Sequence, residues 1–179
     1  MNHKASSEAL KAMLTKAKGK LAAARRELKM GTPEEAVSRA YYAAFHAISA
    51  VLASQGFSFS SHAQTIGGFN AHFVRTGLFP KDTNRILHRL FENRQTADYD
   101  WTTVVERASA QRDVKDAAAL VAACQAFLKC TDFGSTNPPL PGLGVSGDSA
   151  GHVAETEGEH GVMSTVASGT SRQMRRNRS

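Results

Sequence analysis

Three side chains that together could bind and cleave a phosphate ester lie within eight residues of this 179-residue sequence: Arg39, Tyr42 and His46. They stand at positions i, i+3 and i+7, so on a helix that turns about 100° per residue they project from the same face. A guanidinium binds phosphate, and an imidazole titrates near neutral pH and can move protons. Core packing alone would favour leucine at these positions. The spacing therefore indicates either a buried polar network or a surface that handles phosphate.

The helix that must carry these residues is well marked in the sequence. The segment Thr32-Pro33-Glu34-Glu35 supplies an N-capping threonine, a proline suited to the first helical position and a glutamate able to close a capping box. Gly56 ends the helix after residue 55. Alanines recur along its length and leave room for close neighbours, so we expect it to be the central helix of the fold.

The rest of the first 130 residues also predicts helix. Apolar residues at spacings of three and four indicate helices over residues 7–30, 81–98 and 104–129, with a weaker one over 61–74. Gly67 and Gly68 predict a bend or break in the weaker helix, because each costs roughly 1 kcal/mol relative to alanine in a helix interior. The sequence shows no alternating pattern typical of β-strands. The expected fold class is all-α, an antiparallel bundle of four long helices plus one short or broken helix.

Composition divides the chain near Thr131. Residues 131–179 are rich in Gly, Ser, Pro and Thr, and we expect them to form a disordered tail with a basic end, following a helical domain over residues 1–130. The net charge of the chain is +6, and residues 1–130 account for +7 of it, because the tail has four arginines against five acidic residues. A basic domain suits an RNA or nucleotide partner. The lack of an apolar run of about 18 residues predicts a cytoplasmic protein without a membrane segment.

Neither a metal nor an organic cofactor is expected. Cys124 and Cys130 stand six apart, a spacing that fits neither a redox pair nor a zinc site. His62, His72 and His88 show no metal-binding pattern, and we expect solvated or capping roles for them.

Three ordered motifs suggest a family. They are Ser-Arg-Ala-Tyr-Tyr-Ala-Ala-Phe-His at 38–46, Phe-Val-Arg-Thr-Gly at 73–77 and Arg-Gln-Thr-Ala-Asp-Tyr-Asp at 94–100. In this order they resemble the HEPN domain family, over residues 7–129. The resemblance implies a helical bundle that forms homodimers. Many HEPN domains are metal-independent endoribonucleases that act as toxins under the control of a nucleotidyltransferase antitoxin.

The resemblance also implies roles for individual residues. In the ribonuclease members, an arginine and a histidine separated by four to six residues on a helix form the active site across a dimer interface. Arg39 would then clamp phosphate and His46 would act as acid or base. Tyr42 would orient phosphate or stack on a base. The supporting or substrate-binding residues would be Tyr42, Arg94, Asp98 and Tyr99.

Other functions and structural roles stay open from the sequence alone. Some HEPN domains are non-catalytic modules that bind a nucleotide or a partner protein, and this chain is compatible with that function. A buried Arg39 would need a carboxylate, which Asp98 or Asp100 would supply if their helices pack together. Arg94 stands four residues before Asp98, so these two residues also have the spacing of a local ion pair.

Overall fold

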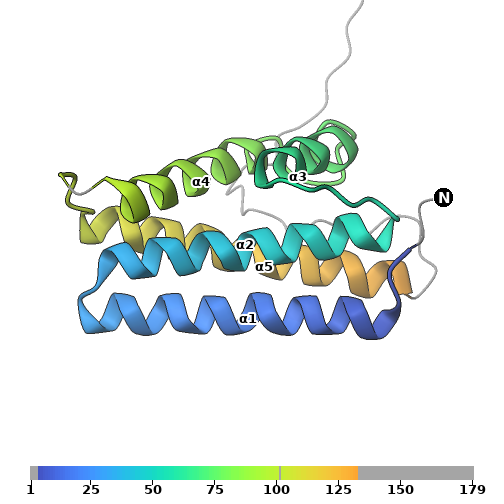
Figure 1. Cartoon of the computed structure of the whole chain (residues 1–179). Coiled ribbons are helices and arrows are strands. Elements are labelled where there is room, and N and C mark those ends of the chain that lie inside the picture. Colours follow the sequence, from blue (N-terminus) through green and yellow to red (C-terminus); the bar gives the residue numbers. More distant parts are fainter. Residues whose placement is uncertain (1–3, 101, 133–179) are drawn as a thin grey trace, which may run out of the picture. The chain divides into compact units, whose positions relative to one another are not determined.

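The structure is a computed structural model that describes residues 4–100 and 102–132. These residues form five α-helices and one π-helical turn, joined by short connections. In chain order they are α1 (Ser7–Met30), α2 (Pro33–Ser54), α3 (His62–Phe69), the π-helix η1 (Asn70–Val74), α4 (Thr83–Tyr99) and α5 (Arg107–Asp132). Successive long helices run in opposite directions (Figure 1). The described residues contain no strand, which confirms the predicted all-α bundle of four long helices and one short one.

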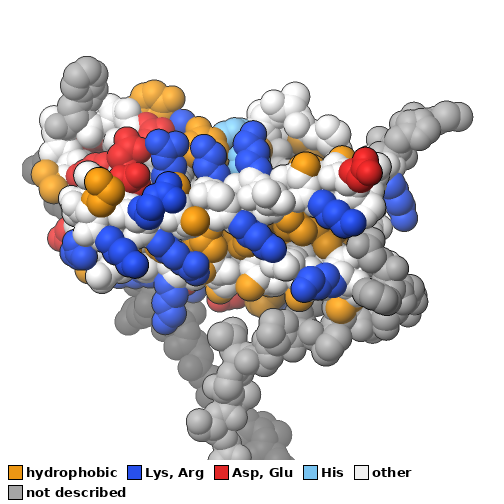
Figure 2. All heavy atoms as spheres, turned by 90° about the horizontal axis from the view of Figure 1, so that it is seen from below, with side chains coloured by type: hydrophobic (Ala, Val, Ile, Leu, Met, Phe, Trp, Pro, Cys, Tyr) orange, Lys and Arg blue, Asp and Glu red, His pale blue; other side chains and the backbone are white. Residues whose placement is uncertain are grey.

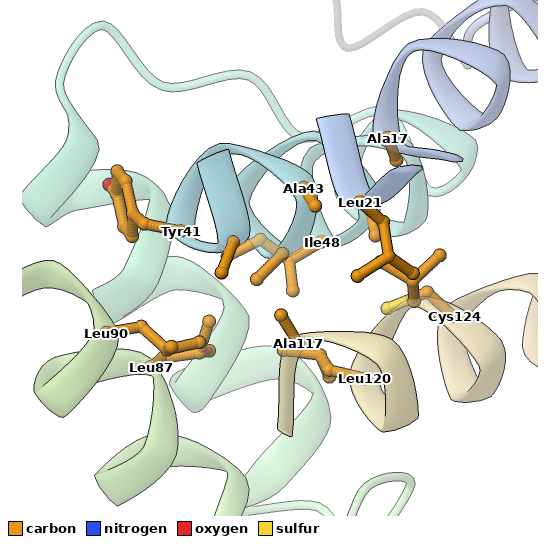
Figure 3. Packing of buried hydrophobic residues seen from close by; sticks show 14 of the residues in the cluster. Ala17, Leu21, Tyr41, Ala43, Ile48, Leu87, Leu90, Ala117, Leu120 and Cys124 are labelled. Carbon is orange, nitrogen blue, oxygen red and sulfur yellow. The ribbon is translucent and has the colours of Figure 1, made fainter. Parts of the chain in front are cut away.

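Helix α2 is the central element, as its alanine content predicted. It contacts α1, α3, α4 and α5. Its close neighbours approach over alanines that have no exposed surface: Ala36, Ala40, Ala43, Ala44, Ala47 and Ala50. Figure 3 shows the core around it, where Leu21 of α1, Leu87 of α4 and Cys124 of α5 gather with Ile48. Completely burying an aliphatic side chain of this size contributes about 1.5–3 kcal/mol, so these contacts hold the four long helices together.

The junction between α1 and α2 differs in one respect from its prediction. Gly31 ends α1 with a φ of 85°, and Pro33 opens α2, both as expected. Thr32, however, makes no capping hydrogen bond to α2. Its hydroxyl donates instead to the Glu27 carbonyl oxygen at 3.1 Å and lies 2.8 Å from Glu27 Oε2. The predicted capping box is therefore wrong, because the threonine hydroxyl is taken by the end of the preceding helix.

Helix α3 passes through its two glycines without a break. The irregularity comes later, at Asn70, where the hydrogen bonding changes to the π-helical pattern of η1. Packing explains the glycine at position 68. A Cβ there would lie 2.3 Å from the ring of Phe59, which packs directly against the backbone of Gly68. The bend or break predicted at the glycines is therefore wrong, and the change in helix type comes only after them.

Helices α4 and α5 are joined by a partly buried ionic network that the sequence did not reveal. Asp113 of α5 is completely buried and accepts hydrogen bonds from Arg89 Nε at 3.2 Å and Asn93 Nδ2 at 2.7 Å. Arg89 also pairs with Asp116. Since a buried carboxylate is tolerated only when it is paired, this network fixes how α4 sits on α5.

The ends of α4 and α5 shift by a few residues from prediction. The last helix begins at Arg107 and ends at Asp132, so it reaches into the segment expected to be tail. The remainder of that predicted disordered tail, with its basic end, lies outside the described residues. Among the residues that are described, none of the helices is both long and apolar enough to span a bilayer.

Candidate functional site

Arg39 lies on the solvent side of α2, above a basic hollow between α1 and α2. The hollow has a volume of about 440 Å³ and is lined by Lys16, Gly19, Lys20, Ala23, Arg26, Glu27 and Arg39. Figure 2, a view onto the α1 face, shows lysine and arginine side chains spread along it, with acidic groups toward the ends. The hollow has a net positive charge, because four cations surround one carboxylate, and such a charge favours anionic ligands.

Arg39 is paired within its own helix. Its guanidinium lies 3.2 Å from Glu35 Oε2, one turn earlier, and 41% of its side chain is exposed. The expected partners are otherwise engaged: Asp98 pairs with Arg94, and Asp100 accepts hydrogen bonds from two threonines, which lower the pKa of Asp100 to about 2. The predicted pairing of Arg39 with Asp98 or Asp100 is therefore wrong. Arg39 is accessible rather than part of a buried network.

Tyr42 and Arg94 do come together, which joins the α2 stripe to the α4 motif. Arg94 Nη2 donates to the Tyr42 hydroxyl at 3.0 Å. The guanidinium lies 5.5 Å from the ring centroid of Tyr42 and 5.3 Å from that of Tyr99. Its Nε lies 2.8 Å from Asp98 Oδ2 without the geometry of a hydrogen bond, so that contact is ionic. The local pair of Arg94 and Asp98 that the spacing allowed is thus present.

His46 lies on a different hollow from Arg39. It is half-buried and lines a cavity of about 450 Å³ with Phe45, Ser49 and Phe57, among other residues. Burial lowers the pKa of His46 below its ordinary value, and the charges of Lys16 and Lys20 lower it further. These effects favour the neutral imidazole, which is the form that can accept a proton.

The same two lysines connect the separate parts of the stripe. Lys16 and Lys20 line the basic hollow beside Arg39 and act on the charge of His46. Lys20 Nζ also lies 5.9 Å from the ring centroid of Tyr42. Nothing in the spacing of the α1 residues singled out these two lysines.

His62, for which the sequence predicted a solvated or capping role, belongs to this region. It is the first residue of α3, and its Nδ1 lies 2.9 Å from the hydroxyl of Tyr41. Its ring centroid is 4.2 Å from that of Phe45 and 6.0 Å from that of Tyr42. Burial lowers the pKa of His62, and the charge of Arg94 adds to this. No local motif marks His62, because only the packing of α3 on α2 brings it there.

Comparison with known proteins identifies the fold. Residues 10–129 match the HEPN domain family. The chain belongs to this family. Every residue of the site described above lies inside the matched segment, which confirms the resemblance deduced from the three motifs. In this HEPN domain the described residues contain no group of three or more His, Cys, Asp or Glu side chains arranged to hold a metal ion.

Two relatives have names that state no activity. A UPF0332 protein of Thermotoga maritima is 45% identical over 36% of this chain and 48% of its own length. A UPF0332 protein of Archaeoglobus fulgidus is 35% identical over 55% of this chain and 78% of its own. The chain thus spans about half of the first relative and over three quarters of the second.

Another relative has a name that indicates a function. The Methanocaldococcus jannaschii protein named Putative toxin MJ0605 is 33% identical to this chain over 51% of this chain and 69% of its own length.

Proposed function

We propose that this HEPN domain is a toxin-type, metal-independent endoribonuclease. The observation that carries the proposal is His46, a half-buried imidazole in a cavity of its own, whose pKa is lowered by burial and by the charges of Lys16 and Lys20, the two lysines that line the hollow of Arg39. A neutral imidazole beside fixed cations suits the cleavage of RNA through its 2′-hydroxyl. The toxin name of a relative supports the same conclusion.

The residues divide the chemistry between them. His46 accepts the proton of the 2′-hydroxyl as the oxygen attacks phosphorus. Arg39, with Lys16 and Lys20, stabilises the negative charge that builds on the phosphate oxygens. Arg94 orients Tyr42 through the 3.0 Å hydrogen bond and holds the edge of the site, with Asp98 and Tyr99 around it.

A nucleotidyltransferase-type antitoxin is the controlling partner of this toxin. The toxin acts in the cytoplasm, where its RNA substrate is found.

The active form is a homodimer. Within one protomer Arg39 and His46 line different hollows. A site that takes Arg39 from one protomer and His46 from the other resolves this separation. Mixing Arg39→Gln with His46→Gln protomers should then restore cleavage that neither variant has alone. An inactive mixture that has exchanged subunits contradicts the shared site.

The cleavage itself is tested with the full chain and a labelled RNA in EDTA. Wild type should cut the RNA, and His46→Gln should lose activity while its helical circular dichroism is unchanged. His88→Gln is the matched control, because His88 is an exposed histidine of α4 outside the site. Cleavage by His46→Gln at the wild-type rate removes His46 from the mechanism, and an inactive wild type removes the ribonuclease proposal.

A second function has its own support in Tyr99. Its side chain is 68% exposed although it lies over the guanidinium of Arg94, a platform suited to stacking with a nucleobase. The corresponding function is a non-catalytic nucleotide-binding module. Saturable binding of a nucleotide that Tyr99→Ala abolishes, with no RNA turnover by wild type, favours this module over the nuclease.

A further inference from the structure

The hydroxyl of Tyr41 holds His62, and a hydroxyl can bond to an imidazole whether or not the imidazole is protonated. Its Nδ1 is 2.9 Å from the hydroxyl of Tyr41, a side chain with no exposed surface. Burial raises the pKa of Tyr41, so its phenol keeps its proton. A hydroxyl donates to the Nδ1 of a neutral imidazole and accepts from the Nδ1–H of an imidazolium. The contact therefore persists in both protonation states of His62.

The same contact determines which edge of the ring is available. Because Nδ1 is turned toward the buried Tyr41, Nε2 on the opposite edge is the nitrogen left for a ligand. His62 is half-buried, so part of the ring reaches solvent. Its orientation is further fixed by Phe45, 4.2 Å away between ring centroids, and by Phe91, 6.4 Å away.

His46 and His62 flank the same aromatic ring. The Phe45 centroid lies 5.9 Å from that of His46 and 4.2 Å from that of His62. The two imidazoles are close enough for the charge of one to lower the pKa of the other. Arg94 on α4 also faces His62 and disfavours its charged form, whereas a bound phosphodiester anion would favour it.

We propose that His62 is the second proton-transfer residue of the site and that it protonates the leaving 5′-oxygen of the cleaved RNA. This inference rests on the proposed ribonuclease function. His46 takes the proton from the 2′-hydroxyl, the 2′-oxygen forms a bond to phosphorus, and the bond from phosphorus to the 5′-oxygen breaks. The imidazolium of His62 gives its proton to that oxygen. The products are a 2′,3′-cyclic phosphate and a 5′-hydroxyl, and both histidines exchange protons with water to return to their starting states.

The test compares two RNA substrates of one sequence under single-turnover conditions in EDTA. One has an ordinary linkage at the cleavage position, and the other has sulfur in place of the 5′-bridging oxygen. A thiolate leaves without being protonated, so the sulfur substrate has no need of an acid. His62→Asn should slow cleavage of the ordinary RNA about 10²–10⁴-fold, the usual contribution of a general acid, and should cleave the sulfur substrate at nearly the wild-type rate. His46→Gln should be slow on both substrates.

Tyr41→Phe and His88→Gln complete the comparison. Tyr41 is a positioning residue, so Tyr41→Phe should show a smaller loss than His62→Asn, again rescued by the sulfur substrate. His88→Gln should match wild type on both. The rescue also shows that His62→Asn is folded.

Wild-type cleavage of ordinary RNA by His62→Asn, or an equal deficit on both substrates, overturns the role of His62. Loss of activity in His46→Gln under those same conditions leaves the ribonuclease proposal intact. A wild-type protein that cuts neither substrate overturns both proposals.

Discussion

Replacing Arg39 by alanine separates the catalytic from the structural interpretation of the α2 stripe. The only ion pair that the described residues provide for Arg39 is a 3.2 Å contact with Glu35, and the two side chains are 41% and 56% exposed. Solvent screens such a pair, and an exposed i,i+4 pair contributes about 0.3–0.5 kcal/mol. Alanine also has a higher helix propensity than arginine. The free energy of unfolding should therefore fall by less than about 1 kcal/mol, against the 3–5 kcal/mol typical of a broken buried ion pair.

Activity should respond very differently. Removing one group that stabilises the transition-state charge costs about 10²–10³ in rate, so cleavage in EDTA should fall by that factor in Arg39→Ala. Urea unfolding followed by circular dichroism gives the stability, and the RNA assay gives the rate. Arg85→Ala, at an exposed arginine of α4, is the matched control and should change neither. A loss of more than 2 kcal/mol in Arg39→Ala would refute the reasoning, because it would show that the guanidinium has a structural role.

Three further predictions concern stability. Asp113→Asn should lower the free energy of unfolding by about 1–3 kcal/mol in urea titrations, because an amide nitrogen replaces one of the two buried oxygens that accept from Arg89 and Asn93. A loss below about 0.5 kcal/mol would show that the packing of α5 does not depend on these hydrogen bonds. Folding lowers the pKa of His46 below its ordinary value of 6.5, so as the pH drops the unfolded chain takes up more protons than the folded one and the free energy of unfolding falls. This fall between pH 7.5 and 5.5 should be smaller in His46→Gln. An equal dependence of stability on pH in wild type and variant contradicts the prediction. Gly67→Ala should stabilise by about 0.4–1 kcal/mol, since nothing lies within 4 Å of its added Cβ. Gly68→Ala should show no such stabilisation, because its added Cβ would clash with the ring of Phe59. Equal midpoints of thermal unfolding for the two variants would show that the ring moves aside freely.

Much of the fold follows from local sequence signals. The bounds of α1 agree with prediction because Gly31 adopts a positive φ that ends the helix, and α2 begins at Pro33 for an equally local reason. The role of Thr32 was mispredicted because its hydroxyl can bond either to the end of α1 or to the start of α2. Which bond forms depends on the three-dimensional geometry of the junction, and residue spacing does not show that geometry. The bend expected at Gly67 and Gly68 likewise failed to appear, since packing overrides a propensity difference of about 1 kcal/mol.

The candidate site was predictable only along single helices. Helical periodicity placed Arg39, Tyr42 and His46 on one stripe, and it placed Arg94 one turn from Asp98. The contact between Tyr42 and Arg94 joins residues that are 52 positions apart. No local pattern encodes such a contact, and the same limit hid His62 and the two lysines of α1.

The sequence by itself determined the helical class of the described domain, the family and the chemical types of groups that the central helix presents. These properties depend on interactions within a few residues, where turn geometry alone relates spacing to direction. Tertiary structure alone decided that Arg39 is accessible, that the charges of Lys16 and Lys20 act on His46, and that Tyr41 holds His62. Burial and charge at these side chains are set by neighbours from other helices, so the protonation states on which the proposed chemistry depends exist only once the helices have packed.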